Sequence, residues 1–244
     1  MRQLNAWTRI IGYFSPHTQQ RAIMSYIEKM TLLCSVQHAI ADAAVKSGRN
    51  PEDITIIVVS KTFFPSAIQQ AFNDGIRIFG ENRVQEAKAK IPQLKGDFSF
   101  HLVGHLQSNK SKDAVRLFSL IHSIDKLSTA QKVDRDAAAI GKTQKILVEV
   151  NTSGETSKSG VNPEETRALC GEILLLKNIE LLGLMTVGPL TEDRDAIRRS
   201  FSLLRTLLGD VNSRLGTSLR ELSMGMSSDY TLAVEEGASM VRIG

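Results

Sequence analysis

Eight short runs of β-branched and aliphatic residues recur along the chain, and they limit its fold more than any other feature. The first run, ITIIVVSK at 54–61, is apolar at successive positions, as in a parallel strand covered on both faces. Segments with helical periodicity separate the runs. Eight alternating strand and helix units favour a closed (β/α)8 barrel over an open doubly wound sheet. The other seven runs are 76–82, 98–104, 119–125, 145–151, 179–187, 221–225 and 240–244.

One further helix is predicted ahead of the first strand. Apolar residues keep helical spacing over 26–47, and Gly48 with Pro51 beyond it forms a stop signal. No low-complexity linker or shift of composition divides 48–244. We therefore expect an α/β protein whose single domain is a TIM-like barrel with an N-terminal helix before strand 1.

Residues 1–25 stand apart from this pattern. They carry three arginines and no acidic residue, beside a short apolar patch. A transit peptide looks similar, but we favour a disordered extension, or a segment upstream of a second start at Met24. The expected barrel domain therefore spans 26–244.

Composition excludes several classes of protein. The 30 Lys+Arg residues are interleaved with 26 Asp+Glu residues, which argues against a nucleic-acid surface. No apolar run reaches the ~18 uninterrupted residues of a membrane helix. Cys34 and Cys170 form no pattern, so we expect reduced thiols in a cytoplasmic protein. His101 and His105 lack a third ligand nearby in sequence, and no metal is expected.

Lys61 is the sharpest candidate for chemistry. Function in such barrels sits at the carboxyl ends of the strands, and Lys61 directly follows the apolar run IIVVS. An amine in the barrel mouth is partly desolvated and suited to Schiff-base chemistry. The simpler alternative is a solvated lysine at a strand end.

The segment GMSSD at 225–229 is a candidate anion site. Its glycine permits close backbone approach, Ser227 and Ser228 offer hydroxyls, and Asp229 opens a short helix. The alternative is an ordinary serine cap on that helix.

Arg242 lies in the last strand, in the sequence MVRIG, and is expected to point into the barrel. A permanently charged guanidinium in the interior needs a partner. That partner is either a ligand near Lys61 or a core carboxylate such as Glu149 or Glu81.

The order of seven motifs resembles the pyridoxal phosphate homeostasis protein family over roughly residues 25–244. The combination of SKT, FGEN, LQSNK and GMS is more specific than any single motif. The resemblance implies a fold-type III barrel that binds pyridoxal 5'-phosphate and is similar to the N-terminal domain of alanine racemase. The motifs are SKT at 60–62, FGENRVQE at 79–86, HLVGHLQSNK at 101–110, SKSG at 157–160, GLM at 183–185, SMGMSSDY at 223–230 and MVRIG at 240–244.

The resemblance also implies roles for particular residues. Lys61 matches the family's Schiff-base lysine, and Asn82 of FGEN would sit near the cofactor ring. Ser227 and Gly244 match phosphate-binding positions. Arg242 matches the arginine that faces the pyridine nitrogen in the racemase relatives, which weakens the ring as an electron sink. The implied cofactor-binding set is Lys61, Asn82, Met226, Ser227, Arg242 and Gly244.

The resemblance implies a monomer that holds pyridoxal phosphate and delivers it, keeping the free cofactor low, with no established reaction and no catalytic residue. Cofactor-requiring apo-enzymes are the implied partners. Family members continue beyond the RIG motif, so the barrel is expected to be truncated at strand 8, with weaker cofactor retention.

Three alternatives remain open. One is an amino-acid racemase of low activity, although no second base stands out in the sequence. Another is an aldolase that uses Lys61 on a phosphorylated sugar. The third is a docking scaffold for cofactor-using enzymes, which would bind to basic helices such as 192–208 and to the loop that carries Lys158.

Overall fold

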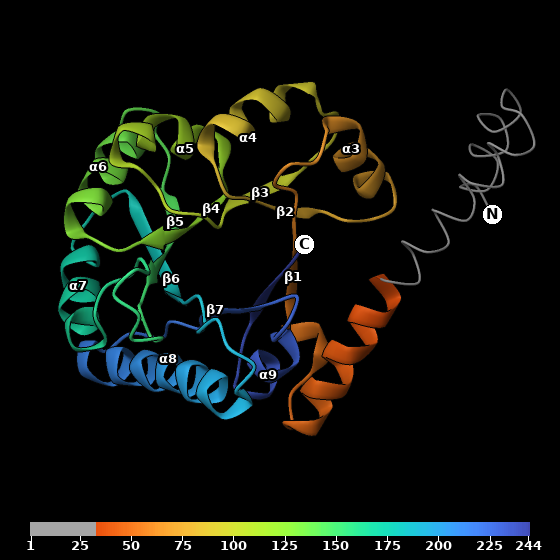
Figure 1. Ribbon diagram of the computed structural model, residues 1–244. Helices are drawn as coiled ribbons and strands as arrows, with labels where there is room; N and C mark the ends of the chain where they lie inside the picture. Colours follow the sequence, from red (N-terminus) through yellow and green to blue (C-terminus); the bar gives the residue numbers. More distant parts are fainter. Residues whose placement is uncertain (1–32) are drawn as a thin grey trace, which may run out of the picture. The chain divides into compact units, whose positions relative to one another are not determined.

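The computed structural model describes residues 33–244, and its centre is a closed barrel of eight parallel strands (Figure 1). Each strand pairs with the next, and the eighth returns to the first, where Ile57 lies opposite Arg242. The predicted (β/α)8 barrel is confirmed. The strands are β1 Thr55–Val59, β2 Ile78–Glu81, β3 Ser99–Leu102, β4 Leu120–Ile124, β5 Gln144–Glu149, β6 Ile179–Met185, β7 Glu221–Met226 and β8 Met240–Ile243.

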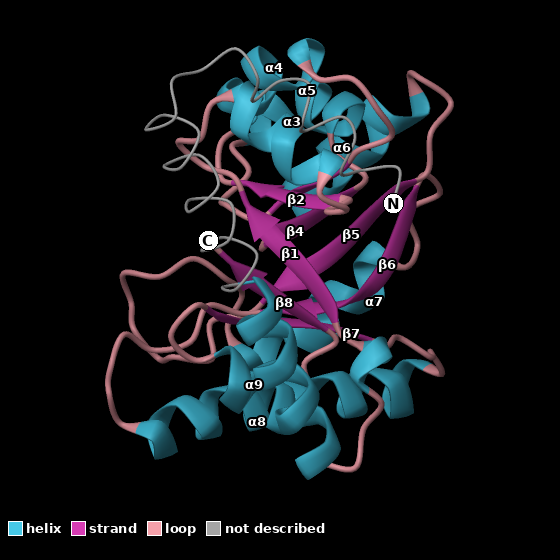
Figure 2. Ribbon diagram, turned by 90° about the vertical axis from the view of Figure 1, so that its right-hand side faces the viewer, coloured by secondary structure: helices cyan, strands magenta, loops and turns pink. Residues whose placement is uncertain are grey.

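Helices cover the outer face of the barrel. Figure 2 shows α3 to α6 on one side of the strands, with α8 and α9 on the opposite side. The α-helices are α3 Pro65–Asn73, α4 Val84–Lys90, α5 Ser111–Leu117, α6 Leu127–Ala138, α7 Thr166–Ile173, α8 Arg194–Leu215 and α9 Tyr230–Glu235. In the part of the chain that the structure describes, four 3-10 turns accompany them: η1 Pro51–Asp53, η2 Ile91–Gln93, η3 Ser108–Lys110 and η4 Pro163–Glu165.

The long helix α8 illustrates how local sequence sets the boundaries. The Asp193 carboxylate accepts hydrogen bonds from the N–H groups of Asp195 and Ala196, at 2.9 and 3.2 Å, which caps the first turn. Gly216 then ends the helix with a left-handed backbone, φ 65°.

The helix predicted over 26–47 is present where the structure describes it. Residues 33–46 are helical, and Gly48 follows with φ 70°. The start of this helix and the extension predicted over 1–25 lie outside the described residues. Residues 43–244 form one compact unit, and the predicted domain boundaries stay a prediction. Within 33–244, no helix is long and apolar enough to cross a membrane.

The barrel interior changes from apolar to polar along the strands. One buried cluster joins inward-facing side chains of five strands, Ile57, Leu120, Leu147, Met185 and Met240. Side chains alternate between the two faces of a strand, so the next inward positions are two residues further on. On β1, β5 and β8 these are Val59, Glu149 and Arg242, which line a cavity at the carboxyl ends of the strands.

Candidate functional site

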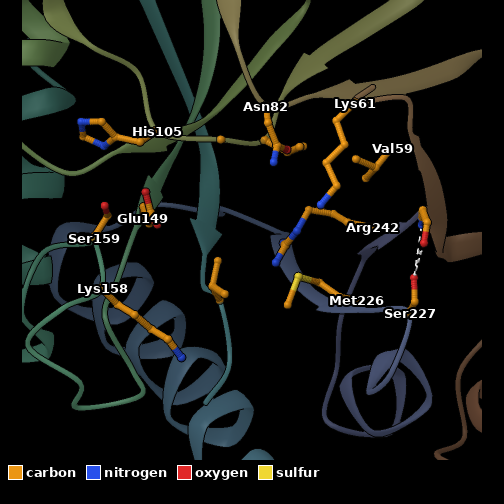
Figure 3. Close-up of a pocket in the computed structure, with 14 residues that line it drawn as sticks. Val59, Lys61, Asn82, His105, Glu149, Lys158, Ser159, Met226, Ser227 and Arg242 are labelled. Carbon is orange, nitrogen blue, oxygen red and sulfur yellow. Dashed lines mark hydrogen bonds between the residues drawn. The ribbon is translucent and has the colours of Figure 1, made fainter. Parts of the chain in front are cut away.

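The six predicted cofactor-binding residues line one cavity of about 390 Å³ (Figure 3). They reach it from different strand ends: Lys61 follows β1, Asn82 follows β2, and Arg242 belongs to β8. Neighbouring strand ends therefore bring together residues that are up to 183 positions apart in sequence. The remaining lining residues are Val59, Val103, Gly104, His105, Glu149, Lys158, Ser159 and Val187.

Lys61 reaches the cavity from an exposed position on the loop after β1. Figure 3 shows its amine directed toward Arg242. Within residues 33–244 that amine has no hydrogen-bond or ion-pair partner, so the chain leaves it available to a ligand. The next residue, Thr62, has φ 66°, a left-handed conformation that a β-branched residue rarely adopts. The chain therefore turns sharply just after the lysine.

A buried ion pair holds the strand ends that carry Lys61 and Asn82. Glu81 is fully buried on β2, and its Oε1 accepts hydrogen bonds from Ser60 Oγ at 2.7 Å and Lys90 Nζ at 3.0 Å. Lys90 on α4 also donates to the backbone oxygen of Ser60 at 2.9 Å. Ser60 and Glu81 directly precede Lys61 and Asn82, so this cluster fixes where both functional residues leave their strands.

The predicted GMSSD segment forms a tight turn between β7 and α9. Gly225 has φ 90°, and a Cβ there would lie 2.5 Å from the Cβ of Ala233. The N–H of Met226 donates to Asp229 Oδ1 at 2.6 Å, and the N–H of Asp229 donates back to the Met226 oxygen at 3.0 Å. Asp229, not a serine, is the N-cap residue of α9. The alternative of a serine cap is therefore wrong.

Ser227 instead faces the end of β8. Its hydroxyl donates to the Gly244 oxygen at 2.9 Å, and its Oγ accepts from the Gly244 N–H at 3.2 Å. A Cβ on Gly244 would lie 2.9 Å from the Cβ of Val59, so only glycine fits here without displacing β1. The rim of the cavity thus presents a hydroxyl and a backbone N–H close together.

Arg242 is buried and is held by neutral groups. It donates to Ser223 Oγ at 2.7 Å and to the backbone oxygen of Thr186 at 2.8 Å. No carboxylate of the described residues lies within ion-pair distance. Glu81 pairs with Lys90 instead, so the alternative in which a core carboxylate pairs with Arg242 is wrong. Burial lowers the pKa of Arg242 to about 10, while the more distant Asp229 and Glu149 oppose that shift.

Two buried histidines extend this contact into the barrel. His122 Nδ1 lies 2.9 Å from Ser223 Oγ, and His122 Nε2 lies 3.1 Å from His101 Nδ1. Because a guanidinium can only donate, Ser223 Oγ accepts a hydrogen bond from Arg242. Ser223, His122 and His101 thus form a chain of hydrogen-bond contacts behind Arg242, in which each neutral imidazole ring carries one N–H and one acceptor nitrogen. Both rings are neutral, because burial lowers the pKa of His101 to about 4 and that of His122 well below its usual value.

The wall across the cavity from Lys61 is acidic. Glu149 is only 6% exposed, and its Oε2 accepts no hydrogen bond from the described residues. Burial, with a smaller contribution from Asp125, raises the pKa of Glu149 to about 7, and Arg242 opposes the rise. Lys158 does not pair with it, because its amine donates to Glu155 Oε1 and to the Gly188 oxygen, both at 2.7 Å.

Sequence reasoning considered Glu149 only as a partner for Arg242 and missed its place at the cavity. The available signal was a single acidic residue between Val148 and Val150 in an apolar strand. The two histidines singled out in the sequence, His101 and His105, do not lie together. His101 is buried against His122, whereas His105 lies beyond β3, with its Nδ1 atom 3.9 Å from Asp125 Oδ2. No group of three or more metal-ligating side chains occurs among residues 33–244.

The fold and the site define a barrel of the alanine racemase type. The family model described as the N-terminal domain of alanine racemase matches residues 47–244. A solved alanine racemase from Clostridium difficile has the same fold, with a TM-score of 0.68 and 18% identity. That similarity covers 85% of this chain and 53% of the racemase chain.

Curated relatives narrow this class to one family. A protein from Aquifex aeolicus named pyridoxal phosphate homeostasis protein is 39% identical over 213 residues, which are 87% of this chain and 93% of the relative. The protein of the same name from Pseudomonas aeruginosa is also 39% identical, over 87% of this chain and 91% of the relative. The chain belongs to the pyridoxal phosphate homeostasis protein family.

A solved structure that is similar to this chain carries the cofactor. PipY of Synechococcus elongatus, described with pyridoxal phosphate bound, is 38% identical, with a TM-score of 0.75 over 84% of this chain and 97% of PipY. The curated relatives are named for homeostasis of the cofactor and not for a reaction.

Proposed function

We propose that this protein binds pyridoxal 5'-phosphate in the cavity at the carboxyl end of the barrel and takes part in intracellular homeostasis of that cofactor. The observation that carries the proposal is the lysine amine without a partner, in one cavity with a buried arginine and a serine–glycine rim. The family relationship and the cofactor-bound relative support it.

The residues of the cavity fit the chemistry of this cofactor. When bound, pyridoxal phosphate supplies an aldehyde, to which amines bond reversibly. Lys61 is the amine that would hold it covalently. The Ser227 hydroxyl and the Gly244 N–H now bond to each other's residue, and both could exchange these hydrogen bonds for ones to phosphate oxygens, while the glycine leaves room for close approach.

Arg242 would orient the ring without giving it a proton. Its pKa of about 10 leaves the guanidinium charged at neutral pH, and its contact with Ser223 fixes its direction. A cationic donor would keep a facing ring nitrogen unprotonated and so weaken the ring as an electron sink, as the resemblance implies for the racemase relatives too. Because the curated relatives are named for homeostasis of the cofactor and not for a reaction, we favour holding and release over catalysis.

Release also follows from the position of Lys61. This residue is exposed, so water and other amines can reach its bond to the cofactor. We propose that apo-enzymes which require the cofactor receive it, that the protein works as a monomer, and that it does so in the cytoplasm.

The test is to add pyridoxal phosphate, trap the covalent adduct with borohydride and map the modified peptide by mass spectrometry. Lys61→Ala removes the proposed amine, whereas Lys158→Ala removes another amine that lines the same cavity. We expect the adduct on Lys61, its loss in Lys61→Ala and its retention in Lys158→Ala. An adduct scattered over surface lysines, or one that survives Lys61→Ala, would contradict the proposal.

A further inference from the structure

The proposed function leaves one buried ionisable group of the cavity unused. Glu149 is 94% buried, because its relative exposure is 6%, and it lines the cavity at the end of β5. Its Oε2 is screened from solvent and accepts no hydrogen bond within residues 33–244. Figure 3 shows it across the cavity from Lys61, on the side of His105 and Ser159. A buried carboxylate oxygen without a donor is costly.

The cations that line the same cavity do not pair with this carboxylate. Arg242 donates to Ser223 and to the Thr186 oxygen, and Lys158 donates to Glu155 and to the Gly188 oxygen. Another carboxylate, Asp125 at the end of β4, adds negative potential at Glu149. This wall of the cavity therefore attracts a cation that carries hydrogen-bond donors.

We propose that Glu149 binds the ammonium group of a primary amine inside the cavity, and that this amine is the acceptor that removes the cofactor. The ammonium would first give one proton to the Glu149 carboxylate, because only the neutral amine is a nucleophile. The amine nitrogen would then form a bond to the aldehyde carbon of the cofactor as the bond from that carbon to Lys61 breaks, and the three protons of the ammonium would end on the released Lys61 amine, the first by way of Glu149. The inference rests on the proposed function and names the substrate class of its release step. An ammonium group supplies three donors and a positive charge, which match an unpartnered carboxylate beside a second one. A neutral hydroxyl supplies one hydrogen bond and leaves the charge uncompensated.

The arrangement separates holding from release. Lys61, Ser227 and Gly244 lie on the β1, β7 and β8 side of the cavity, whereas Glu149 lies on β5. An amine bound at Glu149 thus occupies the same cavity as the lysine-held aldehyde without displacing the phosphate-side groups. Loss of Glu149 should slow removal of the cofactor by amines and leave its binding intact.

The experiment uses ethylamine as the probe and Glu149→Gln as the variant, which keeps the shape of the side chain and removes its charge. Glu180→Gln is the control, because Glu180 lies on the neighbouring strand β6 with an exposed side chain. One arm measures ethylamine binding to the chain without cofactor by calorimetry. The other arm measures the rate at which ethylamine releases cofactor from the loaded protein.

We expect Glu149→Gln to weaken ethylamine binding and slow ethylamine-dependent release, each by about tenfold or more, as for loss of a hydrogen bond to a charged group. Release without amine and the behaviour of Glu180→Gln should be unchanged. Equal ethylamine binding by the wild type and Glu149→Gln, or equal amine-dependent release, would overturn the inference. A wild-type chain that takes up no cofactor would instead refute the proposed function, and the binding arm would still decide about Glu149.

A repeat with Nα-acetyl-lysine amide identifies the source of the amine. If the site accepts this probe with the same dependence on Glu149, a lysine side chain of an acceptor protein is a substrate. If it accepts ethylamine alone, the substrate is a small free amine. Both results support an ammonium site at Glu149.

Discussion

Removing the amine of Lys90 tests whether the buried pair with Glu81 holds the two strand ends that carry Lys61 and Asn82. Glu81 is fully buried and the Lys90 side chain is 12% exposed. Lys90→Met keeps most of the apolar stem and leaves the carboxylate without its cation. Loss of one partner from a buried pair costs about 3 to 5 kcal/mol. With a urea m-value of about 3 kcal/mol/M, the unfolding midpoint should fall by roughly 1 to 1.7 M.

The matched control lies two residues earlier on the same helix. Lys88 pairs with Asp113 at 3.0 Å, but its side chain is 62% exposed, so Lys88→Met should cost less than about 1 kcal/mol. Urea unfolding followed by circular dichroism measures both variants. Adding Glu81→Gln to Lys90→Met should restore part of the loss, because the unpaired charge is then gone. Equal midpoint shifts for the two lysine variants would refute the reasoning.

Three further results follow from the structure. Gly225→Ala should destabilise the protein by more than about 1 kcal/mol, because φ is 90° and the new Cβ meets Ala233. Gly209→Ala, in open space on α8, should stabilise it by about 0.5 to 1 kcal/mol; similar melting temperatures for the two would contradict this. The pKa of Glu149 is raised from 4.5 to about 7, chiefly by burial, so between these pH values the folded state keeps a proton that the unfolded state has already lost. As the pH rises from about 4.5 to 7, the free energy of unfolding should therefore fall more for the wild type than for Glu149→Gln. Parallel pH profiles of the unfolding free energy for the two proteins would exclude that effect. A thiol reagent followed by peptide mass mapping should label exposed Cys34 and spare Cys170, whose pKa burial raises to about 12; rapid labelling of both would be evidence against the buried position.

The barrel itself was predictable from hydropathy. Each of the eight apolar runs contains or largely overlaps one observed strand, because strands covered inside and outside by the protein need apolar residues on both faces. Several runs extend past their strands. The run 54–61, for example, includes Ser60 and Lys61, whereas β1 ends at Val59. Those extra residues are the ones that turn over the rim and carry the site.

The site was only partly predictable. The rule that strand ends meet at one mouth was enough to bring Lys61, Asn82 and Arg242 together. The partners of Arg242 could not be predicted from the sequence, because the stagger of the barrel decides which inward-facing residue of β7 lies level with Arg242. That residue is Ser223, which in turn contacts His122, 101 residues away in sequence. No local sequence pattern predicts a contact between residues so far apart.

The pairing of β1 with β8 has a consequence for how the protein gains function as it folds. Lys61 lies just after one edge of this seam, and Arg242 with Gly244 lies on the other. Closing a loop this long has a large entropic cost, so the seam is expected to form late. A ligand that contacts both edges binds only the closed barrel and draws the folding equilibrium toward it. The bound cofactor would thus stabilise the pairing of β1 with β8. In a cell that lacks the cofactor, a larger fraction of this protein would have these two strands unpaired.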